Sequence, residues 1–247
     1  MDLEGKRVLV TGATAGIGEA TARAFVEAGA HVVLAARRRE RLDALVEELG
    51  DRAEALVLDV ADRAAVEAAP AGAFEVDILV NNAGLARGTD PLHTADPSDW
   101  EEMVDTNVLG LLYVTRRVAA GMAARGEGHI VNLGSVAGRW TYPGGGVYCA
   151  TKHAVRALSE GLRMDLHGSG VRVTNIEPGL VETEFSMVRF GGDEQRAAAV
   201  YEGTRALSAQ DVAETILWCC GRPAHVNVQE LVLFPTDQAS VGMVLRA

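Results

Sequence analysis

The sequence predicts a single α/β domain in which a seven-stranded parallel sheet is covered by helices on both faces. Short apolar runs alternate with longer stretches of helical periodicity, which is the pattern of βαβ units. The first run ends in a glycine-rich turn, TGATAGIG, that leads directly into a helical stretch. With 247 residues, 48% of them hydrophobic, the chain can fill one large core. No linker, repeat or low-complexity stretch interrupts the pattern, so we expect one domain over residues 1–247.

Each expected strand is a short apolar run. In chain order they are RVLVT at 7–11, HVVLAA at 31–36, ALVLDV at 55–60, DILVNNAG at 77–84, HIVNLGS at 129–135, VRVTNIEPG at 171–179 and VQELVLF at 228–234. Helical patterns separate most of them, and the longest cover about 97–125 and 147–166. The stretch from Gly191 to about Gly203 is the least regular, and we expect residues 184–203 to form a mobile loop beside the substrate.

Charge and composition exclude several classes of function. The formal net charge is −11 and the only basic run is RRRER at 37–41, so no nucleic-acid partner is expected. No apolar run approaches the roughly 18 residues of a membrane span, and the amino terminus lacks the apolar core of a secretory signal. The three cysteines and six histidines show no metal-ligand spacing, which predicts neither a metal site nor a disulfide framework. We therefore expect a cytoplasmic protein with reduced, buried cysteines.

The glycine-rich turn predicts a dinucleotide site. Gly12, Gly16 and Gly18 follow the first expected strand and open the first expected helix. Glycine permits a sharp turn and lets the backbone approach a pyrophosphate, which the free N–H groups of a helix start attract. The spacing Gly-x-x-x-Gly-x-Gly differs from the usual Gly-x-Gly-x-x-Gly, and a glycine-rich turn alone also serves plain packing. Thr14 and Ile17, in the same turn, are further candidates for contact with the cofactor.

The end of the second expected strand distinguishes between the two nicotinamide cofactors. An acidic residue there would hold the ribose hydroxyls of NAD, whereas this strand runs into Arg37 and Arg38. A guanidinium matches the geometry of a phosphate, so we expect NADP(H) in preference to NAD(H). The alternative is that both arginines are merely solvated at a helix start, where the helix dipole disfavours cations. Further cofactor candidates, at the ends of the third and fourth strands, are Asp59, Val60, Asn81, Ala83 and Gly84.

The stretch SVAGRWTYPGGGVYCATK at 135–152 carries the candidate catalytic residues. Tyr148 and Lys152 are four residues apart in an expected helix, which places them on one face, one turn apart. A nearby ammonium favours the phenolate, so such a phenol can donate or accept a proton near neutral pH. Ser135, at the end of a strand, can hydrogen-bond a substrate carbonyl or hydroxyl. This spacing is also common in surface packing, so the interpretation depends on the dinucleotide site.

Together these motifs resemble those of the short-chain dehydrogenase/reductase family along essentially the whole chain. The likeness runs from TGATAGIG through NNAG, DTNVLG and the Ser135–Tyr148–Lys152 set to NIEPGLVETEF. The resemblance implies a twisted, doubly wound sheet of the Rossmann type. It also implies a homotetramer whose dimers form through the helices at about 97–125 and 147–166.

The resemblance further implies roles for individual residues. Tyr148 would be the acid/base, Ser135 would orient the substrate oxygen, and Lys152 would lower the tyrosine pKa and hold the nicotinamide ribose. Asn107, within DTNVLG, would hold a water that links Lys152 to solvent. The residues that would cradle the nicotinamide end are Pro178, Gly179, Val181 and Thr183.

Within the family, DLHGSGVRVTNIEPGLVETEFSMVRF and RPAHVNVQEL are most similar to NADP-dependent 3-hydroxy acid dehydrogenases that act on serine, allo-threonine and related acids. This implies hydride transfer between NADP(H) and a small 3-hydroxy acid or the matching carbonyl compound. A broader NADPH-dependent reductase of ketones or aldehydes is the alternative, because sister groups share every catalytic motif. A regulator that binds NADP(H) without turnover is a remote alternative, since that function usually requires loss of the tyrosine or the lysine.

Substrate choice is expected to depend on the turn at 139–142 and on the segment 184–192. Arg189 is a candidate anchor for a substrate carboxylate, because a guanidinium binds that group through two hydrogen bonds. The alternative is a surface arginine paired with Glu182 or Glu184. Two aromatic residues are candidates for the pocket wall, although aromatic residues after a strand are more often part of the core. They are Trp140 and Tyr142.

Overall fold

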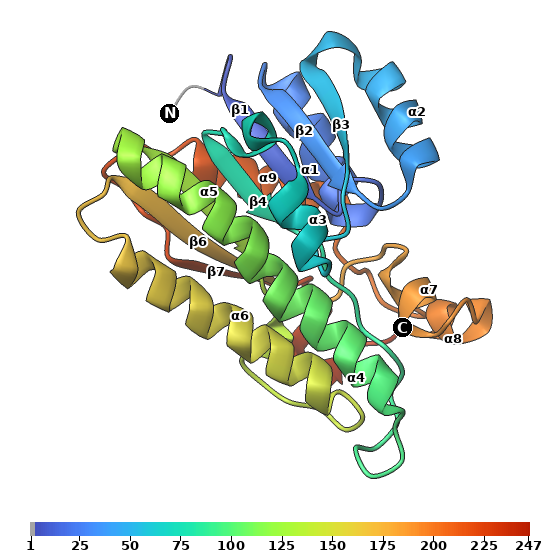
Figure 1. Ribbon diagram of the computed structural model, residues 1–247. Coiled ribbons are helices and arrows are strands. Elements are labelled where there is room, and N and C mark those ends of the chain that lie inside the picture. Colours follow the sequence, from blue (N-terminus) through green and yellow to red (C-terminus); the bar gives the residue numbers. More distant parts are fainter. Residues whose placement is uncertain (1–2) are drawn as a thin grey trace.

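A computed structural model describes residues 3–247, so residues 1 and 2 of the expected domain lie outside it. Seven strands form one sheet in the order β3-β2-β1-β4-β5-β6-β7, and every neighbouring pair is parallel (Figure 1). The strands are β1 Arg7–Thr11, β2 His31–Ala36, β3 Ala53–Val57, β4 Ile78–Asn81, β5 Gly128–Leu133, β6 Val171–Pro178 and β7 Glu230–Leu233. The predicted fold class is confirmed.

The helices lie in two layers, one on each face of the sheet. One layer contains α1 (Gly16–Glu27), α2 (Arg39–Leu49) and α9 (Ala209–Cys220). The other contains α3 (Arg63–Ala68), α5 (Leu111–Arg125) and α6 (Gly146–Asp165), and Figure 1 shows the last two side by side. Alternate strand residues serve the two cores, as Val8 and Val10 of β1 do for the first and Leu9 for the second. Because both faces are covered, the middle of each central strand is a continuous apolar run, as in Val8–Val10 of β1 and Ile78–Val80 of β4.

The strand order reverses beside β1, which has β2 on one side and β4 on the other. In open parallel sheets, ligands bind outside the carboxyl ends of the strands at such a switch point. The turns that follow the central strands meet at this edge. The topology therefore brings together the sequence motifs that end each predicted strand.

The helix predicted at about 97–125 is present, but it is not α-helical throughout. α4 (Pro97–Val104) and α5 are joined by a π-helical stretch of 6 residues, Asp105–Gly110. A Cβ on Gly110 would lie 2.8 Å from Cγ2 of Val60, so the helix passes very close to the chain that follows β3. Such π-helical stretches occur frequently at functional sites, and this one contains the predicted catalytic residue Asn107.

Several elements were not expected from the sequence. They are α3, α9, α8 (Glu194–Ala199) and a two-stranded ribbon of β8 (Gln238–Ser240) and β9 (Met243–Val244). Each of these helices nevertheless begins after a residue type that is typical of an N-cap. The side chains of Asp62, Asp193 and Ser208 accept backbone hydrogen bonds at the starts of α3, α8 and α9. Helices as short as α3 and α8 show too little periodicity to be recognised without that signal.

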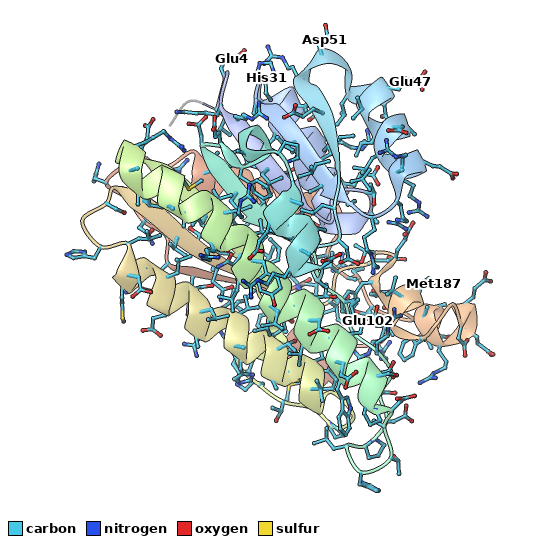
Figure 2. All side chains as sticks on the ribbon, in the orientation of Figure 1. Glu4, His31, Glu47, Asp51, Glu102 and Met187 are labelled. Atoms are coloured by element: carbon cyan, nitrogen blue, oxygen red, sulfur yellow. The ribbon has the colours of Figure 1, made fainter. Side chains whose placement is uncertain are left out.

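The segment expected to be a mobile loop, residues 184–203, contains α7 (Phe185–Arg189) and α8. Arg87 ties α7 to α4, because its guanidinium binds Glu102 at 2.6 and 2.8 Å and donates to the carbonyl oxygen of Val188 at 2.6 Å. Figure 2 labels Glu102 and Met187 at this junction. At the far end of the segment, the N–H of Ala247 donates to Gly203 at 2.8 Å, so the carboxyl terminus lies against it.

Cys149, Cys219 and Cys220 are free and buried, as predicted. None of the helices within residues 3–247 is long and apolar enough to cross a bilayer. Over the same residues, no three His, Cys, Asp or Glu side chains gather in a way that could hold a metal ion.

Candidate active site

A cleft of about 500 Å³ opens at the carboxyl edge of the sheet, beside the switch point between β1 and β4. Most predicted cofactor residues line it. They are Gly12, Thr14, Gly16, Ile17, Arg37, Arg38, Asp59, Val60, Ala83, Gly84, Tyr148, Lys152, Pro178, Gly179, Val181 and Thr183. Ser135, Tyr142 and Arg189 line the same cleft, so the cofactor, catalytic and substrate candidates share one cavity.

The turn between β1 and α1 uses its glycines in different ways. Gly12 and Gly16 have φ angles of +65° and +52°, a region that residues with a side chain disfavour. A Cβ on Gly18 would lie 2.3 Å from the carbonyl oxygen of Gly12. Gly18 does not line the cleft, so packing of the turn itself requires this glycine. Ala15 gives α1 no side-chain cap, which leaves the amino end of this 12-residue helix available to an anion.

The structure corrects the prediction at the end of β4. Asn81 does not face the cleft, because its Nδ2 donates to Oγ1 of Thr115 at 2.8 Å and to Oδ1 of Asn132 at 2.9 Å. Asn82 lines the cleft instead, and its Nδ2 donates to the carbonyl oxygen of Thr11 at 2.9 Å. Neighbouring side chains point to opposite sides of an extended chain, so only one asparagine of the pair can face the ligand.

Arg37 and Arg38 lie where β2 leaves the sheet, at the end of the cleft that Asp59 borders. Nη1 of Arg37 is 3.8 Å from Oδ2 of Asp59. Nη2 of Arg38 donates to Oγ1 of Thr14 at 3.1 Å, which holds this guanidinium against the glycine-rich turn. An anion in this part of the cleft would therefore meet two cationic side chains.

A third arginine, Arg41, belongs to the same cluster and was not predicted. Its Nη1 donates to both carboxylate oxygens of Glu184 at 2.9 Å, and Nη1 of Arg38 lies 3.4 Å from the same carboxylate. Glu184 thus joins the segment that follows β6 to the start of α2. The sequence carried no signal for this contact, since the partners are 143 positions apart.

Tyr148 and Lys152 both face the cleft from α6, one turn apart, as predicted. Nζ of Lys152 is 5.9 Å from the centroid of the Tyr148 ring and donates to the carbonyl oxygen of Leu133 at 2.7 Å. Ser135, which follows β5, lies near enough to the Tyr148 phenol for its hydroxyl to lower the phenol pKa. The end of β5 therefore places Ser135, and α6 places Tyr148 and Lys152, around one point of the cleft.

Burial dominates the acid–base properties of this site. It raises the pKa of the Tyr148 phenol well above its ordinary value, and Tyr142 raises it further. The nearby hydroxyl of Ser135 and the charge of Arg189 lower the pKa of Tyr148, but by less. Burial also lowers the pKa of Lys152 to about 8. The groups that lower the phenol pKa in this structure are thus Ser135 and Arg189, whereas the sequence pointed to Lys152.

Asn107 is 2% exposed and does not line the cleft. Its Oδ1 accepts from the N–H of Leu85 and its Nδ2 donates to the Leu85 carbonyl, both at 2.8 Å. Nδ2 also donates to Oγ1 of Thr151 at 3.1 Å. A Cβ on Gly84 would lie 3.2 Å from Oδ1 of Asn107 and 3.6 Å from Nζ of Lys152, so the two side chains are near neighbours. The water-mediated role of Asn107 stays a prediction.

Arg189, at the end of α7, lines the cleft beside Tyr148. Its guanidinium carbon is 6.0 Å from the centroid of the Tyr148 ring. Nε donates to the carbonyl oxygen of Gly88 and Nη1 to the phenol oxygen of Tyr142, both at 3.0 Å. Nη2 is buried and has no hydrogen-bond partner within residues 3–247. Glu184, one of the two acids offered as its surface partner, is bound to Arg41 instead.

The two aromatic candidates for the pocket wall differ in position. Tyr142 lines the cleft, whereas Trp140 does not. The Trp140 side chain is half-exposed, and its ring centroid is 6.2 Å from that of Phe234, outside the cleft. Lining residues that the sequence did not indicate include Tyr201 and Gln238, which reach the cleft from the last quarter of the chain.

A protein-family model described as short chain dehydrogenase matches residues 6–193. The chain belongs to the short chain dehydrogenase family. This match confirms the resemblance read from the motifs.

This short chain dehydrogenase is similar over almost its whole length to two named enzymes and to a solved structure. The chain is 53% identical over 241 residues to the NADP-dependent 3-hydroxy acid dehydrogenase YdfG of Escherichia coli strain K12, covering 96% of this chain and 97% of that protein. It is 47% identical over 239 residues to the serine 3-dehydrogenase of Agrobacterium fabrum, covering 95% and 96%. Among solved structures, the closed form of serine dehydrogenase complexed with NADP⁺ has a TM-score of 0.93 and 52% identity, with 98% and 99% covered.

Proposed function

We propose that this protein transfers a hydride between NADP(H) and a small 3-hydroxy acid or the matching carbonyl compound. Arg189 carries the proposal, because its buried Nη2 lacks a partner within the described chain while its guanidinium lies 6.0 Å from the Tyr148 ring. A partly buried cation with an unused, buried donor favours an anionic partner. A small molecule with a carboxylate and a nearby hydroxyl can contact both residues at once. The names of the relatives support the same substrate class.

The other half of the cleft fits the cofactor. A Cβ on Gly12 would lie 2.9 Å from Nδ2 of Asn82, so the bare backbone is what leaves room at the turn. The open amino end of α1 suits a pyrophosphate, and Arg37 and Arg38 suit the 2′-phosphate that distinguishes NADP from NAD. When bound, NADP(H) supplies the acceptor or donor of the hydride. One structural neighbour was solved with NADP⁺.

Proton transfer is the task of the protein side chains. In oxidation, the Tyr148 phenolate accepts the proton of the substrate hydroxyl, while Ser135 hydrogen-bonds the same oxygen. In reduction, the phenol returns the proton to the developing alkoxide. Lys152, beside the tyrosine, adds positive charge and offers Nζ–H donors for the ribose hydroxyls of the cofactor. Phe185, with its ring centroid 5.7 Å from that of Tyr148, limits access of water to the phenol.

Initial rates of oxidation test the substrate and cofactor together. The panel is L-serine, L-allo-threonine, 3-hydroxyisobutyrate and a neutral secondary alcohol, each with NADP⁺ and with NAD⁺. Turnover of the hydroxy acids with NADP⁺ preferred is the expected result. Activity confined to the neutral alcohol would favour the broader ketone and aldehyde reductase instead. Binding of NADP⁺ without turnover of any compound would favour the regulator.

We also propose that the protein is a cytoplasmic homotetramer. Apolar side chains are exposed on the outer surfaces of α4, α5 and α6, as at Val104, Leu112 and Met164, which supports association through these helices. The free thiols suit a reducing compartment. Light scattering of the purified protein tests the assembly, and a monomer mass would contradict it. Cell fractionation tests the location.

A further inference from the structure

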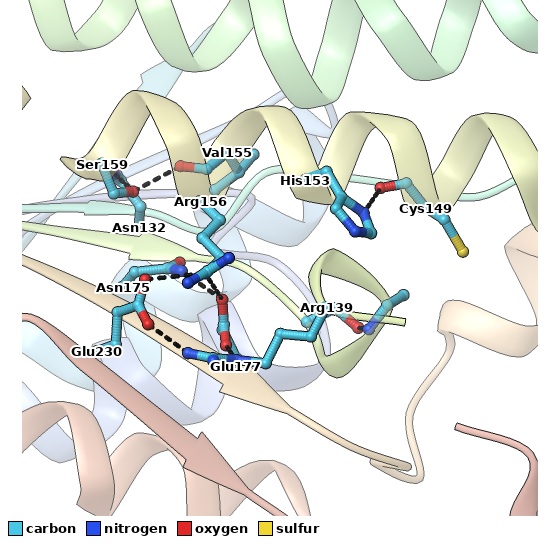
Figure 3. A network of polar contacts seen from close by, with 12 residues as sticks. Asn132, Arg139, Cys149, His153, Val155, Arg156, Ser159, Asn175, Glu177 and Glu230 are labelled. Atoms are coloured by element: carbon cyan, nitrogen blue, oxygen red, sulfur yellow. Dashed lines mark hydrogen bonds and ion pairs between the residues drawn. The ribbon is translucent and has the colours of Figure 1, made fainter. Parts of the chain in front are cut away.

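Arg139, Arg156, Glu177 and Glu230 form a ring of four charged side chains (Figure 3), of which Glu177 is fully buried and the other three are partly exposed. Glu177 and Glu230 each bind both Arg139 and Arg156. Nε of Arg156 is 3.0 Å from Oε1 of Glu230 and 3.9 Å from Oε1 of Glu177. Arg139 donates from Nε to the carboxylate of Glu177 and from Nη2 to the carboxylate of Glu230. The ring therefore holds two guanidinium groups and two carboxylates, whose charges cancel.

Glu177 is the buried centre of this ring. Its side chain is 0% exposed, and burial raises the pKa of its carboxyl group. Nδ2 of Asn175 donates to Oε1 of Glu177 at 2.7 Å. None of the ring residues lines the cleft, so none of them contacts a ligand there. A buried ion pair is weak evidence for stability, because an apolar pair of similar size is often as stable. The ring therefore needs another explanation.

Three of the four ring members come from chain segments that also carry a residue of the site. Arg139 follows Ser135 by four positions, on the same short turn. Arg156 follows Lys152 by one helical turn on α6. Glu177 directly precedes Pro178, whose side chain lines the cleft. The ring thus joins the serine turn, the helix of the tyrosine and the wall beside the nicotinamide end.

Close packing leaves the serine turn little freedom. A Cβ on Gly138 would lie 2.7 Å from the carbonyl oxygen of Lys152, so the turn rests directly on the α6 backbone. A Cβ on Gly134 would lie 3.0 Å from Cγ of Glu177. The turn is therefore held against α6 at one glycine and against β6 at the other. Arg139, at the end of the turn, is its polar attachment to Glu177.

We propose that Glu177 is a positioning residue for catalysis, which acts through Arg139 to hold Ser135 against the Tyr148 phenol. The inference rests on the proposed dehydrogenase function. Its mechanism is geometric, since a displacement of about 1 Å far from the chemistry can cost about 100-fold in rate. Because the nearby Ser135 hydroxyl lowers the phenol pKa, a displaced turn also changes the pH at which the tyrosine titrates.

The test compares Glu177→Gln with Ser135→Ala in oxidation, through kcat against pH at saturating substrate and NADP⁺. We expect Glu177→Gln to lower kcat by about tenfold or more. We expect its pH midpoint to move upward, as in Ser135→Ala, while the dissociation constant for NADP⁺ changes less than about twofold. A double variant of Glu177→Gln and Arg139→Gln should lose no more kcat than Arg139→Gln alone, because the two residues act as one unit.

Removing one buried charge leaves its partner uncompensated, so Glu177→Gln can fail to fold. The combination of Glu177→Leu with Arg139→Met removes both charges, keeps an apolar volume and lacks the directed hydrogen bonds. We expect it to fold and still to lose kcat with the upward pH shift. Arg172→Met is the matched control, because Arg172 is buried at the other end of β6 and caps α9 through the carbonyl oxygens of Cys219 and Cys220. It should lower the melting temperature and leave the pH midpoint in place.

Two outcomes would overturn the inference. One is wild-type kcat and pH midpoint in the folded Glu177 variants, which would make the ring structural. The other is weakened NADP⁺ binding with unchanged kcat, which would assign Glu177 to the cofactor wall through Pro178. A wild-type enzyme without hydroxy acid turnover refutes the proposed function instead, so the two failures are separate.

Discussion

Nη1 of Arg189 donates a hydrogen bond to the phenol oxygen of Tyr142 at 3.0 Å, while Nη2 of the same guanidinium is buried without a partner in residues 3–247. Nη1 therefore orients the guanidinium, whereas Nη2 is the proposed anchor for the substrate carboxylate. Mutations of Arg189 and of Tyr142 can distinguish these two roles.

Arg189→Ala is expected to raise KM for a 3-hydroxy acid by about 10- to 100-fold, the cost of a lost charge-assisted hydrogen bond. For a neutral secondary alcohol, KM should change little, since no carboxylate is lost. Tyr142→Phe keeps the cation and removes only the orienting oxygen, so its effect on the hydroxy acid should be smaller. Steady-state kinetics with both substrates check this, and equal effects on acid and alcohol would refute the anchor.

Arg38→Ala is expected to raise KM for NADP⁺ by about 10- to 100-fold and to leave KM for NAD⁺ within about threefold. The guanidinium lies against Thr14 of the glycine-rich turn, where a 2′-phosphate would be bound but NAD has only a hydroxyl. Arg39 belongs to the same basic run and does not line the cleft, so Arg39→Ala is the matched control. Equal loss with both cofactors would show that Arg38 does not recognise the phosphate.

Tyr148→Phe is expected to lower kcat by at least about 100-fold, because it removes the proton donor and acceptor. The ring remains to pack against Phe185, so the fold and the site for NADP⁺ should persist. Calorimetric titration with NADP⁺ should give a dissociation constant close to that of the wild type. Turnover at a wild-type rate would remove Tyr148 from the mechanism.

Lys152→Met is expected to raise the free energy of unfolding at pH 7 while abolishing turnover, a trade of function for stability. Burial lowers the pKa of Lys152 from 10.5 to about 8. At pH values below 8 the ammonium is charged in both states and must be buried on folding, which costs up to about 3 kcal/mol at about 1.4 kcal/mol per pH unit. Loss of the hydrogen bond to Leu133 offsets about 1 kcal/mol of the gain.

The same difference should depend on pH. Between about pH 8 and 10.5 the folded wild type loses this proton before the unfolded chain does, so the cost of burial fades as pH rises. The advantage of Lys152→Met over the wild type should therefore shrink across that window. Urea denaturation of both proteins at pH 7 and pH 9.5 measures it. A difference that is the same at both pH values would contradict the buried ammonium as its cause.

Local patterns were enough to predict the sheet and the ends of its strands. The strands of a parallel sheet are buried on both faces and are therefore mostly apolar. For this reason the short apolar runs of the sequence were recognisable as strands of such a sheet. The sequence also indicated the dinucleotide-binding turn, because its glycines lie within one loop before α1. It indicated the pair Tyr148 and Lys152 because the two residues lie one helical turn apart.

The sequence predicted Asn81 in the cleft, whereas Asn82 lines it, because two adjacent asparagines give no sign of which one faces the ligand at a strand end. Trp140 stayed a candidate for the pocket wall beside Tyr142, because nothing local in the sequence indicates which way a turn faces.

The sequence by itself determined the fold class, the dinucleotide site and the serine, tyrosine and lysine of the candidate site, since each is written in contiguous residues or fixed short spacings. Only the tertiary structure decided that Arg189 meets Tyr142, that Glu184 binds Arg41, and that Glu177 joins Arg139 behind Ser135. These contacts connect residues about 40 to 140 positions apart, and each depends on how strands and helices stack. The direction of the Tyr148 pKa shift belongs to the same class, because burial is a property of the packed molecule and not of a motif.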